Sequence, residues 1–161
     1  MRKRIIGQGP GELAGAQPGW IDLERLAQVE ITSEDVDHPI ESALIPDTGP
    51  GWQAAQPGEQ TIRLWFDEPL SVKRINLEFQ EAEQGRTQEF VLRWSPDGGQ
   101  SYREIVRQQY NFSPPAATHE VEDYKVDLAN VTVLELKIVP DISGGRTRAS
   151  LAQLRIGSFS A

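Results

Sequence analysis

The sequence predicts an all-β protein, an antiparallel β-sandwich of about eight strands. Three observations support this prediction. Apolar and polar side chains alternate along several segments, glycine and proline separate these segments, and one segment runs into a tight hairpin turn. The length of 161 residues is that of one domain with a hydrophobic core of its own.

The alternating segments identify the strands and the residues that they bury. Alternation is typical of a strand with one face on the core and the other in water. It is clearest at 62–66, 75–79, 90–94, 124–128 and 134–138, with shorter candidates at 29–32, 51–55, 102–107 and 151–156. Only 21–28 has helical spacing. The predicted core comprises Leu64, Phe66, Ile75, Leu77, Phe79, Phe90, Leu92, Trp94, Leu134, Leu136 and Ile138.

Composition restricts the partners and the compartment. The net charge of −8 opposes the phosphate neutralisation on which nucleic-acid affinity depends, so we expect no nucleic-acid partner. No apolar run is long enough for a signal peptide or a membrane span, and cysteine is absent, so we expect a cytoplasmic protein without membrane contact. Glycine and proline are frequent in residues 1–19, which we predict to be a flexible lead-in to a folded domain at 20–161.

The hairpin carries a family resemblance. Phe90, Leu92 and Trp94 share one strand face, and Asp97-Gly98 begins a tight turn. This pattern resembles the central hairpin of discoidin, or coagulation-factor type C, domains of the galactose-binding-domain-like group, and weaker similarity extends over about 29–157. The resemblance implies a jelly-roll sandwich whose loops at one end bind a ligand, often a sugar.

Four polar residues in predicted loops are candidates for ligand binding. His38 follows two carboxylates in the first long loop, and related domains place a histidine there to contact a sugar hydroxyl; a solvated histidine is the alternative. Arg86, Asn111 and Arg146 lie in three later loops rich in polar and aromatic residues; ordinary surface residues or salt-bridge partners are the alternative for these three. Such loops can supply the apolar surface and the hydrogen bonds that a sugar requires.

The resemblance also implies a calcium site, with Asp47 as a side-chain ligand. A glutamate is expected near the last strand, but this chain has Gln153 there. A neutral amide reduces the ligand charge and predicts weak calcium binding. Apart from calcium, no cofactor is expected.

Three classes of function follow. The first is a non-catalytic binding module for carbohydrate, and the second is an intracellular protein-interaction or scaffold domain. An enzyme is not expected, because no nucleophile–base spacing, metal-ligand constellation or cofactor loop is present. Trp65 lies on the face opposite the predicted core, where it is either covered by the amino-terminal segment or exposed as a contact residue.

Overall fold

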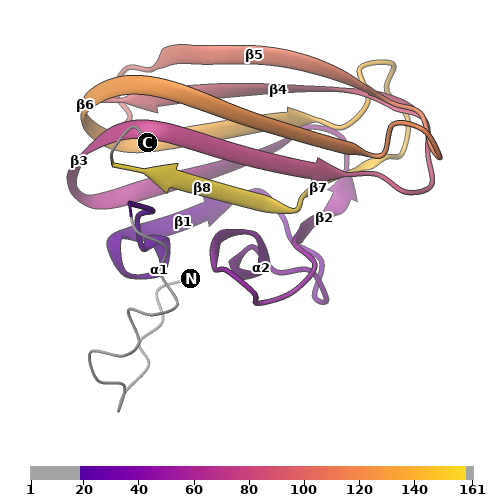
Figure 1. The fold of residues 1–161 in the computed structure, drawn as a ribbon, viewed down its shortest axis with the longest axis horizontal. Helices are drawn as coiled ribbons and strands as arrows, with labels where there is room; N and C mark the ends of the chain where they lie inside the picture. The colour runs from indigo at the N-terminus through magenta and orange to yellow at the C-terminus, as the bar shows by residue number, and fades with distance from the viewer. Residues whose placement is uncertain (1–18, 159–161) are drawn as a thin grey trace.

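The computed structural model describes residues 19–158, which form an antiparallel β-sandwich with two short helices (Figure 1). The elements in chain order are α1 (Leu23–Leu26), β1 (Ala27–Ile31), α2 (Glu41–Leu44), β2 (Trp52–Pro57), β3 (Gln60–Gln80), β4 (Arg86–Ser95), β5 (Arg103–Phe112), β6 (His119–Val139), β7 (Arg148–Leu151) and β8 (Gln153–Gly157). No described helix is long and apolar enough to cross a membrane.

Strands β3 and β6 are long and belong to both layers of the sandwich. The first half of β3 pairs with β1 and with the second half of β6, which also pairs with β4; β5 lies beyond β4. The second half of β3 pairs with β8 and with the first half of β6. Register shifts between Trp65 and Arg74 allow β3 to bend, and Figure 1 shows both strands turning back at the same end. The segments 62–66 and 75–79 are therefore halves of one strand.

The residues buried between the layers are those that the alternation of apolar and polar side chains predicted. All eleven predicted core residues are buried, and each lies in the same hydrophobic cluster. Phe79 in one layer stacks on Phe90 in the other, with ring centroids 5.3 Å apart. The antiparallel sandwich predicted from sequence is confirmed.

Two local predictions need correction, and one element was not predicted. The helix expected at 21–28 is only α1, which Asp22 caps, because Ala27 already begins β1. Helix α2 was not predicted. The strand expected at 151–156 is divided at Ala152 into β7 and β8, which pair with different strands.

Trp65 is covered by a part of the chain that the sequence did not suggest. A Cβ built on Gly99 would lie 3.0 Å from Cη2 of Trp65, so the β4–β5 turn packs directly on the indole. Gly99 has a φ of +86°, which favours glycine, and its amide donates to Ser95 Oγ at 2.8 Å. The half-buried Trp65 thus packs under the hairpin turn.

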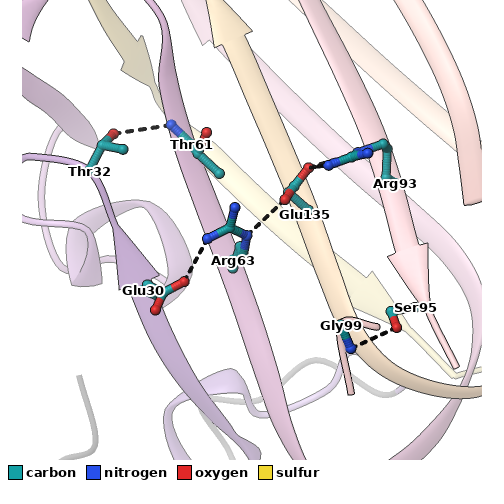
Figure 2. A network of polar contacts seen from close by, with 8 residues as sticks. All are labelled: Glu30, Thr32, Thr61, Arg63, Arg93, Ser95, Gly99 and Glu135. Atoms are coloured by element: carbon teal, nitrogen blue, oxygen red, sulfur yellow. Dashed lines mark hydrogen bonds and ion pairs between the residues drawn. The ribbon is translucent and has the colours of Figure 1, made fainter. Parts of the chain in front are cut away.

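A row of charged side chains crosses the outer face of the layer formed by β1, the first half of β3, the second half of β6, and β4 (Figure 2). Glu135 of β6 lies between Arg63 of β3 and Arg93 of β4 in the strand register, and Glu30 of β1 lies beside Arg63. Arg63 Nε and Arg93 Nε each donate to the Glu135 carboxylate at 2.8 Å, and Arg63 Nη1 reaches Glu30 at 2.8 Å. Opposite charges in register stabilise the order of the strands.

Candidate functional site

A cleft of about 370 Å³ lies at the end of the sandwich where β2 and β7 meet. Its walls come from the loop before α2, the start of β2, the end of β3 with the following loop, and β7. Figure 1 shows β2 and β7 together at one end of the molecule, beside the end of β3. The lining residues are His38, Pro50, Trp52, Gln53, Gln80, Glu81, Ala82, Glu83, Arg148, Ser150, Leu151 and Ala152.

His38 is fixed in the cleft by its own loop. Its Nδ1 lies 2.8 Å from Asp35 Oδ2, and its backbone carbonyl accepts from the amide of Gln53 at 3.2 Å. The same Asp35 carboxylate accepts from the amide of Asp37, which closes a tight turn. The hydrogen bond to His38, and then that to Asp37, lower the pKa of Asp35. With Nδ1 held in this way, Nε2 of His38 is the ring nitrogen left for a ligand.

Arg148 supplies a cation to the same cleft. It begins β7 and is exposed, and its alternation with the buried Ala149 and Leu151 places it with Ser150 on the other strand face. Within residues 19–158, no hydrogen bond or ion pair engages its guanidinium. Arg148 is close enough for its charge to help lower the pKa of Asp35. Its donors are therefore available to a ligand.

The opposite wall is organised around Glu81. Its Oε2 accepts from the amides of Glu83 and Gln84 at 3.1 and 3.2 Å, and its Oε1 accepts from Arg86 Nε at 2.6 Å. Burial raises the pKa of Glu81, but the hydrogen bonds from Arg86 and the two amides outweigh it, so the pKa is lowered. Gln84 also donates to Thr147 Oγ1 at 3.0 Å, which links this loop to the segment before β7.

The four predicted ligand-binding residues do not all line the cleft. His38 lines the cleft. Arg146 lies in the exposed loop before β7 and does not line the cleft. The prediction that Asn111 lies in a loop is wrong, because Asn111 belongs to β5, where its amide oxygen accepts from Thr87 Oγ1 at 2.6 Å. Ligand contact by His38, Asn111 and Arg146 remains a prediction.

The placement of Arg86 in a loop is wrong. Arg86 is the first residue of β4, and its side chain is only 1% exposed because it shares the core-facing side with Gln88 and Phe90. The guanidinium donates to Glu81, Gln88 and the carbonyl of Pro140, and it stacks 4.7 Å from the ring of Phe112. Three N–H groups are engaged and the side chain is almost inaccessible to solvent, so Arg86 supports the wall of the cleft from inside.

Sequence reasoning missed Arg148 and Glu81. The alternation of Arg148-Ala149-Ser150-Leu151 could have identified Arg148, because it places Arg148 and Ser150 on the strand face opposite the apolar Ala149 and Leu151. Glu81 had a weaker signal: it follows the last alternating residue of its strand, where a loop begins, and only the structure shows its bond with Arg86.

The residues at the expected calcium position do not fit that ion. Asp47 is exposed and has a left-handed φ of 60°. Gln153 Oε1 already accepts from Arg155 Nη2 at 3.0 Å, and Gln153 Nε2 donates to Asn76 at 3.2 Å. Burial lowers the pKa of Arg155, while the charge of Asp47 acts in the opposite direction, so the guanidinium lies near that carboxylate. Over residues 19–158, no group of three or more acidic, histidine or cysteine side chains is arranged for a metal.

The fold is shared with several solved structures. The chain is similar to the family 32 carbohydrate-binding module of C. perfringens NanJ in complex with galactose, with 14% identity over 86% of this chain and 97% of that one, and a TM-score of 0.63. It is also similar to the F5/8 type C domain of a Bacteroides fragilis protein, with 14% identity over 90% and 100% of the two chains and a TM-score of 0.60.

A third likeness is to a chain in the structure of reduced XRCC1 bound to the DNA polymerase β catalytic domain, with 16% identity over 84% and 98% of the two chains and a TM-score of 0.60. No protein-family model and no curated protein matches the sequence. Family 32 carbohydrate-binding modules and F5/8 type C domains are among the structural neighbours, and the chain has their discoidin-like sandwich fold.

Proposed function

We propose that the chain is a non-catalytic carbohydrate-binding module and that sugar binds in the cleft between His38 and Arg148. The observation that carries this proposal is the pairing of two groups there: an imidazole oriented by Asp35, and a guanidinium without a partner among the described residues. The structural neighbour with bound galactose supports the choice of ligand class.

The chemistry of the cleft is suited to a sugar. A guanidinium presents several donors in a fixed plane and can bind two neighbouring hydroxyl oxygens. In the tautomer in which Nδ1 of His38 carries the proton and donates a hydrogen bond to Asp35, Nε2 can accept a hydrogen bond from a sugar hydroxyl. Pro50 and Ala152 give apolar surface for the C–H groups of the ring. These groups can bind and orient a sugar, and none forms a nucleophile–base pair, so we infer that no catalysis takes place here.

A protein partner is the second candidate function. The solved structure that contains XRCC1 and a polymerase domain supports it, because it is a complex between proteins. The charged row of Glu30, Arg63, Glu135 and Arg93 would supply the surface, since Arg63 and Arg93 are each about one-third exposed. This role fits a cytoplasmic protein better than polymeric carbohydrate does.

The test compares two neighbouring arginines. Binding of galactose by the purified protein is measured by titration calorimetry, and a glycan array extends the search to other sugars. We expect Arg148→Ala and His38→Ala to weaken binding by about tenfold each, the effect of losing one hydrogen bond from a charged or oriented group. Arg146→Ala is the matched control, because Arg146 does not line the cleft.

Two results would count against sugar binding in the cleft. The first is a loss of binding in Arg146→Ala with none in Arg148→Ala, which would place the sugar on the loop outside the cleft. The second is an array without any hit, which would favour the protein-interaction role.

A further inference from the structure

A chain of polar side chains runs from the wall of the cleft into the interior of the sandwich. Arg86 Nε donates to Glu81 at the cleft, and Arg86 Nη1 donates to Gln88 Oε1 at 3.1 Å. Gln88 Nε2 then donates to Glu120 Oε1 at 3.3 Å. The residues beyond Glu81 are almost inaccessible to solvent: Arg86 is 5% exposed, Gln88 0% and Glu120 2%.

Glu120 at the inner end of this chain is incompletely bonded. Its Oε2 is the one buried side-chain oxygen or nitrogen within residues 19–158 that has no hydrogen-bond partner. Burial raises the pKa of Glu120 to about 8, and the neighbouring carboxyl of Glu122 adds to this effect. An unpaired carboxylate is costly in such a place, so the carboxyl is held as the neutral acid at neutral pH.

The charged and titratable groups around Glu120 come from each element packed on it. Glu122 and Tyr124 lie on the same face of β6, and Arg86 approaches from β4. From β5, Tyr110 donates its hydroxyl to the carbonyl of His119. The adjoining part of β3 presents Phe79 in register with Glu120. Arg86 is thus the cation among these neighbours.

We propose that Glu120 is a positioning residue for the cleft: its neutral form leaves Arg86 bound to Glu81, and its ionised form draws Arg86 away and loosens the 81–85 wall. The effect on ligand affinity rests on the proposed sugar-binding function of the cleft. The effect on the wall does not.

The hydrogen bonds of Glu120 and Glu81 explain why ionisation of Glu120 should loosen the wall. Ionised Glu120 and Glu81 compete for one guanidinium, whose Nη1 is already directed toward the interior through Gln88. When the bond from Arg86 to Glu81 weakens, the Glu81 carboxylate is held less firmly in the position where it accepts from the amides of Glu83 and Gln84. The wall is therefore ordered below the pKa of Glu120 and loosened above it.

The experiment follows the wall without any ligand. Amide chemical shifts of Glu83 and Gln84 are recorded by NMR from pH 6 to 10 in the wild type and in Glu120→Gln, which keeps the shape of the neutral acid. We expect both amides to titrate in the wild type with a midpoint near the raised pKa of Glu120, and to stay flat in the variant. Glu122→Gln should lower the midpoint, because it removes the carboxyl that raises that pKa.

A second measurement connects the wall to the ligand. Galactose affinity should fall by about threefold or more between pH 6 and pH 9 in the wild type and remain constant in Glu120→Gln. If no sugar binds but the amides titrate, the proposed function fails while the positioning role stands. Amides that stay flat in the wild type, or titrate equally in Glu120→Gln, would overturn the positioning role.

Discussion

Glu120 and Glu135 lie on the same strand and are equally hidden from water, yet their surroundings differ. Glu135 is 0% exposed and accepts from Arg63 and Arg93, and these bonds outweigh burial and lower its pKa. Glu120 is 2% exposed and accepts one long hydrogen bond, from Gln88, and burial raises its pKa to about 8. Burial by itself therefore does not set the charge of a carboxyl group in this protein.

The strand register explains the difference. Glu135 faces away from the core, where its two cross-strand neighbours are the arginines of β3 and β4. Glu120 faces inward, beside Phe79, and Arg86 reaches it only through Gln88. A carboxylate with charged neighbours in register joins strands, whereas a buried carboxyl group without them is held as the neutral acid.

The largest effect on stability is expected from a substitution of Glu135. Glu135→Ala should reduce the free energy of unfolding by about 2–4 kcal/mol, because the two partly buried guanidinium groups lose their shared carboxylate. Chemical denaturation at pH 7 measures the change. Glu30→Ala is the matched control in the same row; the Glu30 side chain is 55% exposed, so we expect a loss below about 1 kcal/mol. Equal losses of stability in the two variants would show that the buried ion pairs of Glu135 contribute no more than the exposed one of Glu30.

The two carboxyl groups should also have opposite pH dependence. The stability that Glu135 contributes is present above its ordinary pKa of 4.5 and is lost as the pH falls below that value. For Glu120 the raised pKa means that stability is fully present below 4.5 and is lost as the pH rises toward about 8.

A smaller effect, which grows as the pH rises above 4.5, is expected for Glu120→Gln. The variant should be more stable than the wild type by about 1–3 kcal/mol at pH 9, because an amide carries no charge to bury, with little difference at pH 5. Thermal unfolding over this pH range measures the difference. A variant that is less stable at every pH would mean that Glu120 is ionised and satisfied in the native protein, as Glu135 is.

Sequence predicted the fold well because alternation directly reports which strand face is buried. It identified all eleven proposed core residues, but it could not join 62–66 to 75–79, since a strand that bends through register shifts has the same sequence pattern as two strands with a connection. The short α2 and the division at Ala152 depend on tertiary pairing, which alternation does not report.

Less of the candidate site was predictable. His38 was a candidate and lines the cleft, but Arg86 was placed in a loop because it follows Gly85 in a polar stretch, although it alternates with Gln88 and Phe90. Its burial depends on Glu81 and the carbonyl of Pro140, and neither contact is visible from local sequence. Arg148 lines the cleft because β7 pairs with β2, which is a long-range feature.

The smallest effect on stability is expected from the addition of calcium. Asp47, at the expected calcium position, is a third carboxylate to compare with Glu120 and Glu135. Arg155 lies near Asp47 and donates to Gln153, so a guanidinium supplies positive charge there, as Arg63 and Arg93 do for Glu135. We expect 1 mM calcium, compared with EDTA, to change the free energy of unfolding by less than about 0.5 kcal/mol, the contribution of an ion with a millimolar Kd. Thermal unfolding measures it, with Arg155→Gln as the comparison variant. A melting temperature that rises by many degrees with calcium in the wild type would show that Arg155 does not replace the ion.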